Sequence, residues 1–137
     1  MKKVLFLCTG NSCRSQMAEG FLRHLAGDHY EVFSAGVKPT QVNPMAIKVM
    51  DEIGIDISSQ RSKSVIEFLN HKFDFVITVC DNAQRTCPIF PGQYEKNHWN
   101  LEDPAEFNGS EQEKLDFFRK IRDEIREKIG KFLSVNK

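Results

Sequence analysis

The segment from Cys8 to Ser15 (CTGNSCRS) contains the residue types of a site that binds an oxyanion beside a nucleophilic sulfur. Cys8 ends an apolar run, and Arg14 follows six residues later, where a helical pattern begins. A short loop leading into a helix N-terminus directs backbone N–H groups toward an anion, and an arginine fork can bind two oxygens of a tetrahedral anion. The same field favours a thiolate, so we expect Cys8 to be the nucleophile.

The other residues of this loop have supporting uses. Gly10 lets the backbone approach an anion closely, and the Ser15 hydroxyl can donate to the Cys8 sulfur. The Asn11 side chain can hold the loop by bonding backbone groups. Cys13 fills a tight turn or, alternatively, serves as a second thiol. The predicted oxyanion-binding residues are Thr9, Gly10, Asn11, Ser12, Cys13, Arg14 and Ser15.

Cys80 and Cys87 form a second pair, separated by the six polar or small residues DNAQRT. Two thiols supply two electrons when they are oxidised to a disulfide, and a further thiol can attack that disulfide and carry the oxidation to an exposed place. Alternatively, Cys80 is a core residue and Cys87 an incidental loop thiol. A zinc site built from all four cysteines is a third interpretation, but the C-x₄-C and C-x₆-C spacings match zinc sites poorly.

Asp103-Pro104 follows the last predicted strand, where the chain can return to the mouth of the Cys8 loop. A carboxylic acid placed there can protonate a leaving oxygen. The alternative is an ordinary turn, which is the commonest use of this dipeptide.

Apolar patterns predict an alternation of strands and helices that positions these residues. We expect strands over residues 3–8, 30–35, 73–80 and near 98–101. We expect helices over residues 15–27 and 43–54, from Ser62 or Ser64 to Leu69, and over about the last 25 residues, with a loop over 81–92. This order is typical of one α/β domain over residues 1–137, with a central four-stranded parallel sheet flanked by helices on both faces. Ligands bind at the carboxyl ends of such strands, where Cys8 and Cys80 fall.

Composition excludes several classes of function. The chain has 137 residues, with 19 basic and 19 acidic side chains and a formal net charge of zero, which argues against a nucleic-acid or anionic-membrane surface. The apolar run after Met1 is too short for an export signal, and no stretch is long enough for a membrane span. We therefore expect a protein of the cytoplasm, where cysteines are catalytic, redox-active or metal-binding rather than paired in structural disulfides. We also expect a monomer.

The stretch VLFL followed by CTGNSCRS resembles the nucleophile loop of the low-molecular-weight tyrosine phosphatase fold, which thioredoxin-coupled arsenate reductases share. TVCDNAQRTCPIFPG, with HWNLEDP downstream, is similar to the redox segment of those reductases, and the resemblance covers essentially the whole chain. Phosphatases of this fold lack the second cysteine pair. They commonly carry an aromatic residue after the Asp-Pro, where this chain has Ala105.

The resemblance implies reduction of arsenate to arsenite without a metal or organic cofactor. Cys8 would attack arsenate held by the loop and Arg14, and Asp103 would protonate the departing oxygen. Cys80 would then form a disulfide with Cys8, and Cys87 would attack Cys80, leaving a disulfide for thioredoxin to reduce. Glutathione or glutaredoxin as reductant, a tyrosine phosphatase, and a non-enzymatic thiol redox sensor remain the alternatives, although a sensor would have no use for Arg14 and Asp103.

Asn11, Glu19 and Ser34 match positions that build a potassium site in some of these reductases. This chain has Lys63 where those members carry an aspartate. The Lys63 ammonium either takes the place of the ion or is a solvated surface group.

Overall fold

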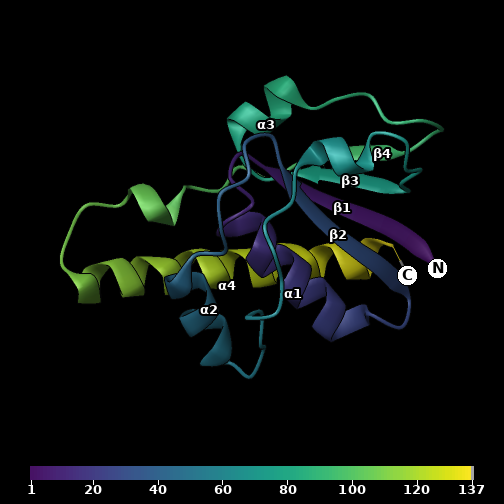
Figure 1. Cartoon of the computed structure of the whole chain (residues 1–137). Helices are drawn as coiled ribbons and strands as arrows, with labels where there is room; N and C mark the ends of the chain where they lie inside the picture. The colour runs from purple at the N-terminus through teal and green to yellow at the C-terminus, as the bar shows by residue number, and fades with distance from the viewer. Residues whose placement is uncertain (137) are drawn as a thin grey trace.

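A parallel sheet of four strands forms the centre of the structure, a computed structural model that describes residues 1–136 (Figure 1). The strands lie in the order β2-β1-β3-β4, and every neighbouring pair is parallel. Their bounds are β1 Lys2–Cys8, β2 Tyr30–Gly36, β3 Phe75–Thr78 and β4 Glu95–His98. β1 lies in the middle and is buried from Val4 to Cys8, as its unbroken apolar run predicts. The predicted fold class is confirmed.

Helices cover both faces of the sheet, as predicted. The helical elements are α1 Arg14–Ala26, α2 Pro44–Asp51, η1 Val65–Phe68, α3 Asp81–Thr86, η2 Pro104–Glu106 and α4 Glu111–Val135. The long helices α1 and α4 lie on one face with α2 beside them, and α3 and η1 lie on the other (Figure 1). On that second face Phe33 of β2 packs edge-on against Phe68 of η1.

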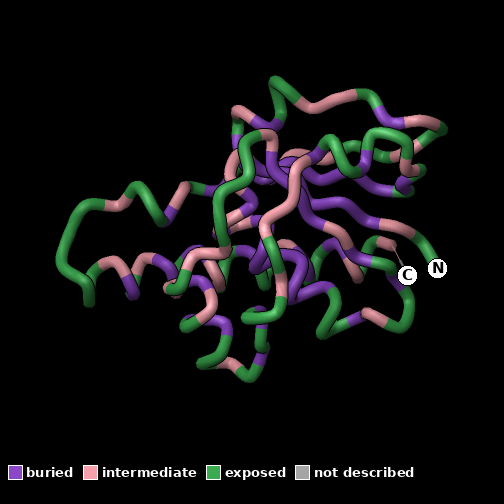
Figure 2. The backbone as a smooth tube through the Cα atoms, viewed as in Figure 1, coloured by how far each residue is buried: buried purple, intermediate pink, exposed green. Residues whose placement is uncertain are grey.

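The longest helix is positioned by a single apolar stripe. Its buried residues are the six that the sequence predicts: Leu115, Phe118, Ile121, Ile125, Ile129 and Phe132. A capping box between Ser110 and Glu113 fixes where α4 begins. Buried residues gather along the strands and the inner sides of α1 and α4 (Figure 2). Within residues 1–136 no helix is both long and apolar enough to cross a membrane.

Two sequence predictions for the segment that follows β3 are wrong, and β3 itself is shorter than predicted. Residues 81–86 are predicted as a loop but form α3. The only buried residue of this helix is Ala83, so its sequence has no apolar periodicity that could indicate a helix. The strand predicted near residues 98–101 lies instead at Glu95–His98, on the edge of the sheet, where Glu95 and Lys96 are exposed and give no apolar alternation. The strand predicted over residues 73–80 has only the four residues of β3 in ladder pairing.

Gly36, the last residue of β2, lies directly against the loop that follows Cys8. A Cβ atom at this position would lie 2.6 Å from the Thr9 carbonyl oxygen and 2.9 Å from the Asn11 nitrogen. Both neighbours are backbone atoms, which cannot rotate away as a side chain can. Gly36 therefore sets how closely β2 and the loop approach.

We predict that Gly36→Ala displaces the loop, lowers the stability by about 1–3 kcal/mol through overpacking, and weakens phosphate binding. Thermal denaturation and titration calorimetry measure the two effects. Gly130→Ala is the matched control, because Gly130 is an exposed residue of α4 whose Cβ would meet nothing within 4 Å, and it should stabilise by about 0.5–1 kcal/mol. Unchanged phosphate affinity in Gly36→Ala would contradict the role given to this glycine.

Candidate active site

The backbone of the loop after Cys8 leaves donors for an anion. The adjacent segment of residues 37–43 binds the outer side of the loop through four N–H to carbonyl bonds of 2.8–3.2 Å: Val37 to Cys8, Lys38 to Thr9, Thr40 to Gly10 and Asn43 to Ser12. The backbone N–H groups of Gly10, Ser12 and Cys13 donate to no acceptor within residues 1–136. Because the carbonyls are bonded on the outer side, these amides are available to an oxyanion at the start of α1.

Asn11 holds this loop in shape from inside the protein. It is fully buried and has a φ of 50°, the left-handed region that asparagine adopts more readily than most residues. Its Nδ2 donates to the hydroxyls of Ser15 at 2.8 Å and Ser34 at 3.0 Å, and its Oδ1 accepts from Gln16 and from the Lys63 backbone, both at 2.9 Å. The predicted holding role of Asn11 therefore extends to side chains of α1 and β2.

The Cys8 sulfur has two hydrogen-bond partners, the Asn11 N–H at 3.1 Å and the Ser15 hydroxyl at 2.8 Å. Since the Asn11 amide already donates to the Ser15 oxygen, the Ser15 proton is free to point at the sulfur. Burial nevertheless raises the pKa of the Cys8 thiol above its ordinary value, while Ser15, Arg14 and the Asn11 N–H lower it. Desolvation thus opposes the donors through which the loop favours a thiolate, and reaction of Cys8 as a thiolate stays a prediction.

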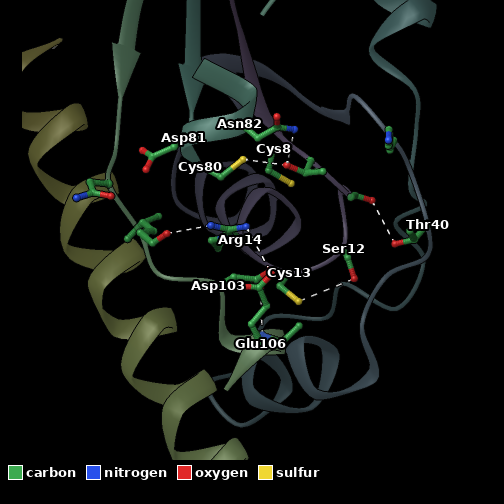
Figure 3. A pocket seen from close by; sticks show the side chains of 16 residues that line it. Cys8, Ser12, Cys13, Arg14, Thr40, Cys80, Asp81, Asn82, Asp103 and Glu106 are labelled. Atoms are coloured by element: carbon green, nitrogen blue, oxygen red, sulfur yellow. Dashed lines mark hydrogen bonds and ion pairs between the residues drawn. The ribbon is translucent and has the colours of Figure 1, made fainter. Parts of the chain in front are cut away.

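Arg14 and Asp103 meet at the mouth of the pocket (Figure 3). An Arg14 Nη2 lies 3.6 Å from an Asp103 carboxylate oxygen, and Nη1 donates to the Leu101 carbonyl at 2.9 Å. Asp103 also caps η2 by accepting from the Ala105 N–H at 3.0 Å. The arginine predicted to bind the oxyanion and the predicted acid are thus neighbours, although the chain separates them by most of its length.

Cys80 opens into the same pocket as Cys8 (Figure 3). Its sulfur lies 3.3 Å from the Thr9 hydroxyl and accepts from the Ala83 N–H at 3.4 Å, which makes it the N-cap of α3. Asn82 Nδ2 donates to the Thr9 oxygen at 3.2 Å, which leaves the Thr9 proton for the Cys80 sulfur. Two donors therefore hold this second sulfur in the pocket that Cys8 lines.

Cys87 lies outside the pocket, at the other end of α3. The helix has six residues, a rise of roughly 9 Å, whereas disulfide-bonded Cα atoms lie within about 7 Å. A Cys80–Cys87 disulfide therefore requires α3 to unwind. Burial raises the pKa of the half-buried Cys87 thiol, and nearby Lys96 lowers it.

Cys13 fits the predicted packing role, because it is a buried N-cap of α1 whose pKa burial raises to about 12. A zinc site of four cysteines gains no support, since residues 1–136 contain no cluster of three or more metal-ligating side chains.

The pocket has a volume of about 650 Å³ and is lined mainly by polar side chains. Sequence reasoning missed Lys38, Thr40, Asn82, Asn100 and Glu106, which also line it. Asn82 and Asn100 lie within the stretches that resemble the redox segment of the reductases, whereas Lys38, Thr40 and Glu106 belong to no motif identified in the sequence. Only the strand order, which brings the residues after β2, β3 and β4 to the end of β1, could have indicated them. No aromatic residue is among those that line this pocket.

Lys63 is a nearly buried group rather than a surface residue, since its side chain is 11% exposed. Its ammonium lies 3.5 Å from a Glu19 carboxylate oxygen and 3.4 Å from the Ser34 hydroxyl, which itself donates to Glu19. Burial lowers the pKa of Lys63, and Glu19 acts in the opposite direction. A positive charge of the chain already neutralises Glu19, so the residues present do not fit a separately bound potassium ion.

Residues 3–137 match the family model described as low molecular weight phosphotyrosine protein phosphatase. The chain belongs to this family. An arsenate reductase of Halalkalibacterium halodurans is 48% identical to it over 136 residues, 99% of this chain and 98% of the relative. A solved structure of an arsenate reductase in its oxidized state is 36% identical, with a TM-score of 0.84 and full coverage of both chains. A thioredoxin-dependent arsenate reductase of Corynebacterium glutamicum is 32% identical, with a TM-score of 0.69 over all of this chain and 64% of that one.

These similarities confirm the resemblance stated from the sequence, both to the low-molecular-weight phosphatase family and to the arsenate reductases within it.

We predict that Ser15→Ala raises the pKa of Cys8 further, because it removes a hydroxyl that lowers it. Iodoacetamide reacts with the thiolate, so alkylation accelerates as pH rises through the pKa, and its midpoint should move to higher pH. Peptide fragmentation distinguishes Cys8 from Cys13 in the alkylated protein. Ser12→Ala is the control, because the Ser12 hydroxyl contacts Cys13 instead, at 3.9 Å. A midpoint that does not move in Ser15→Ala would show that its hydroxyl does not donate to Cys8.

Proposed function

We propose that the chain reduces arsenate to arsenite through Cys8, Cys80 and Cys87, with a thioredoxin-type dithiol as the final reductant. The observation that carries the proposal is the position of Cys80, whose sulfur is held by Thr9 of the oxyanion loop in the pocket of Cys8. A hydrolase needs one sulfur there, whereas a two-electron reduction needs two. The relatives named above support the same reaction.

The first step forms a bond between Cys8 and arsenic. Arsenate is held by the free amides of the loop and by Arg14, and the Cys8 sulfur attacks the arsenic atom. One arsenic–oxygen bond breaks, and Asp103 supplies a proton to the departing oxygen, which leaves as water. The Cys8 thiol passes its proton to an arsenate oxygen as the oxyanion binds, and the sulfur then attacks as a thiolate, with Ser15, Arg14 and the Asn11 N–H lowering its pKa against the effect of burial.

The second step transfers two electrons to arsenic. The Cys80 sulfur attacks the Cys8 sulfur, the sulfur–arsenic bond breaks, and its electron pair stays on arsenic as arsenite leaves. The chain is left with a Cys8–Cys80 disulfide. Cys87 then attacks Cys80 and releases Cys8, which requires α3 to unwind. A dithiol protein reduces the Cys80–Cys87 disulfide and returns the enzyme to its starting state.

A phosphatase is the second candidate, because Cys8, Arg14 and Asp103 suit phosphoester cleavage equally well and the family is named for it. An aryl ester would make few contacts in this pocket, because Ala105 is small and the residues that line the pocket include no aromatic side chain. We therefore expect phosphatase activity only as a weak side reaction. The catalytic groups all come from one chain, and the relay begins with free thiols, so we propose a monomer that works in the reducing cytoplasm.

The decisive assay follows arsenate-dependent NADPH consumption with thioredoxin and thioredoxin reductase, beside p-nitrophenyl phosphate hydrolysis. We expect sustained NADPH consumption in the wild type, and loss of both activities in Cys8→Ser. Phosphatase activity without any arsenate-dependent NADPH consumption would establish the second candidate instead.

We predict that Cys87→Ser stops after one turnover, because Cys8 and Cys80 remain but nothing resolves their disulfide. One arsenite per enzyme should form, and digestion with mass spectrometry should find a trapped Cys8–Cys80 disulfide. Hydrolysis of p-nitrophenyl phosphate should persist. Thioredoxin-supported turnover at near the wild-type rate would contradict the three-thiol relay and point to two thiols resolved by an external one.

Cys80→Ser should stop one step earlier. Cys8 can still attack the oxyanion, but no neighbouring thiol can displace arsenite, so neither the burst of arsenite nor a disulfide to Cys8 should appear. Rapid-quench measurement of arsenite separates this variant from Cys87→Ser. Identical bursts in the two variants would contradict the order of the relay.

A further inference from the structure

Ile89, two residues after Cys87, is 91% exposed, although Phe90 beside it is only 2% exposed. Exposed apolar side chains are common, but such a group next to a redox-active thiol lies where a reducing partner must approach. The pocket of Cys8 and Cys80 does not use Ile89.

The backbone around Ile89 is also open to a partner. Residues 87–92 belong to no helix or strand, and within residues 1–136 the Ile89 N–H donates to no acceptor. The flanking Pro88 and Pro91 have no N–H group to contribute. An unpaired backbone beside an apolar side chain is the arrangement that a partner surface can complete with a few main-chain bonds.

Phe90 holds Ile89 outward. The Phe90 ring packs edge-on against Phe73 and Tyr94, with centroids 5.3 Å and 6.0 Å apart, and its N–H donates to the Tyr94 hydroxyl at 3.2 Å. This anchor lies on the far side of Cys87 from α3. Unwinding of α3 therefore leaves Ile89 in place.

Basic side chains flank the exposed segment. Lys96 is close enough to lower the pKa of Cys87, and the Lys72 side chain lies beside Gly92. Neither lysine, nor Arg85 of α3, forms an ion pair within the described residues 1–136. Glu95, the one acid between Arg85 and Lys96, accepts from Asn97 at 3.0 Å. The surface is complementary to a partner that carries acidic groups around an apolar contact.

We propose that Ile89 is the apolar anchor on which the reducing dithiol protein docks, an inference that rests on the proposed function. The partner is of the thioredoxin type, with an apolar surface beside its reactive cysteine and acidic side chains around it. Docking brings a partner thiolate to the Cys87 sulfur, where a mixed disulfide forms and Cys80 leaves as a thiolate. The second partner thiol then breaks the mixed disulfide, so two electrons pass and the partner becomes the disulfide.

The test compares Ile89→Asp with the conservative Ile89→Leu in turnover supported either by thioredoxin or by dithiothreitol. In Ile89→Asp the KM for thioredoxin should rise on the order of tenfold or more, which corresponds to losing the burial of one large apolar side chain. Turnover with dithiothreitol, which needs no docking surface, should be unchanged. Ile89→Leu should behave as the wild type. Val135→Asp is the matched control, because Val135 is 80% exposed at the end of α4 and should change neither value.

Three results would overturn the proposal. An unchanged KM for thioredoxin in Ile89→Asp would place the docking surface elsewhere. An equal loss with thioredoxin and dithiothreitol would mean that Ile89 serves the rearrangement of α3 rather than docking. Failure of the wild type with both reductants would overturn the proposed function as well, and is therefore distinguishable from the other two.

Discussion

The left-handed backbone of Asn11 is the constraint on which the oxyanion loop depends. A φ of 50° turns its N–H toward the Cys8 sulfur and costs most residue types about 1 kcal/mol or more. Glycine would adopt this backbone without strain, but it would lose the amide that bonds Ser15, Ser34, Gln16 and the Lys63 backbone. Asparagine satisfies both demands. The buried network of Glu19, Ser34 and Lys63 then supports the loop from the side opposite the pocket, which none of the three residues lines.

The same arrangement of two hydrogen bonds orients the sulfur of Cys8 and the sulfur of Cys80. An asparagine amide donates to a hydroxyl, and that hydroxyl is left to donate to sulfur: Asn11 through Ser15 to Cys8, and Asn82 through Thr9 to Cys80. The Thr9 backbone is part of the loop that follows Cys8, and the Thr9 hydroxyl contacts the Cys80 sulfur. In the proposed reaction, the loop that binds arsenate therefore also positions the Cys80 thiol that completes the reduction.

Sequence patterns predicted those parts of the molecule whose physics is local or periodic. The apolar run of β1 and the stripe of α4 were sufficient because burial on those elements repeats along the chain. α3 and β4 were missed or misplaced because a polar six-residue helix and an exposed edge strand leave no such pattern. The contact of Thr9 with Cys80 spans 71 positions and follows only from strand order. The raised pKa of Cys8 follows from burial, which the loop motif does not reveal.

In the proposed relay, the sparse packing of α3 is what allows the oxidation to leave the pocket. The helix buries one side chain, Ala83, and is otherwise held by three polar contacts: the Cys80 cap, the Asn82 amide on Thr9 at 3.2 Å, and the Asp81 carboxylate 3.2 Å from His98. A short helix with so few buried contacts opens at a small fraction of the global unfolding free energy. Attack by Cys80 on Cys8 removes the sulfur from its cap position, so the chemistry itself weakens the helix. In the proposed relay, the first disulfide therefore favours the movement that brings Cys87 to Cys80, while the packing of Phe90 against Phe73 holds the far end of the segment.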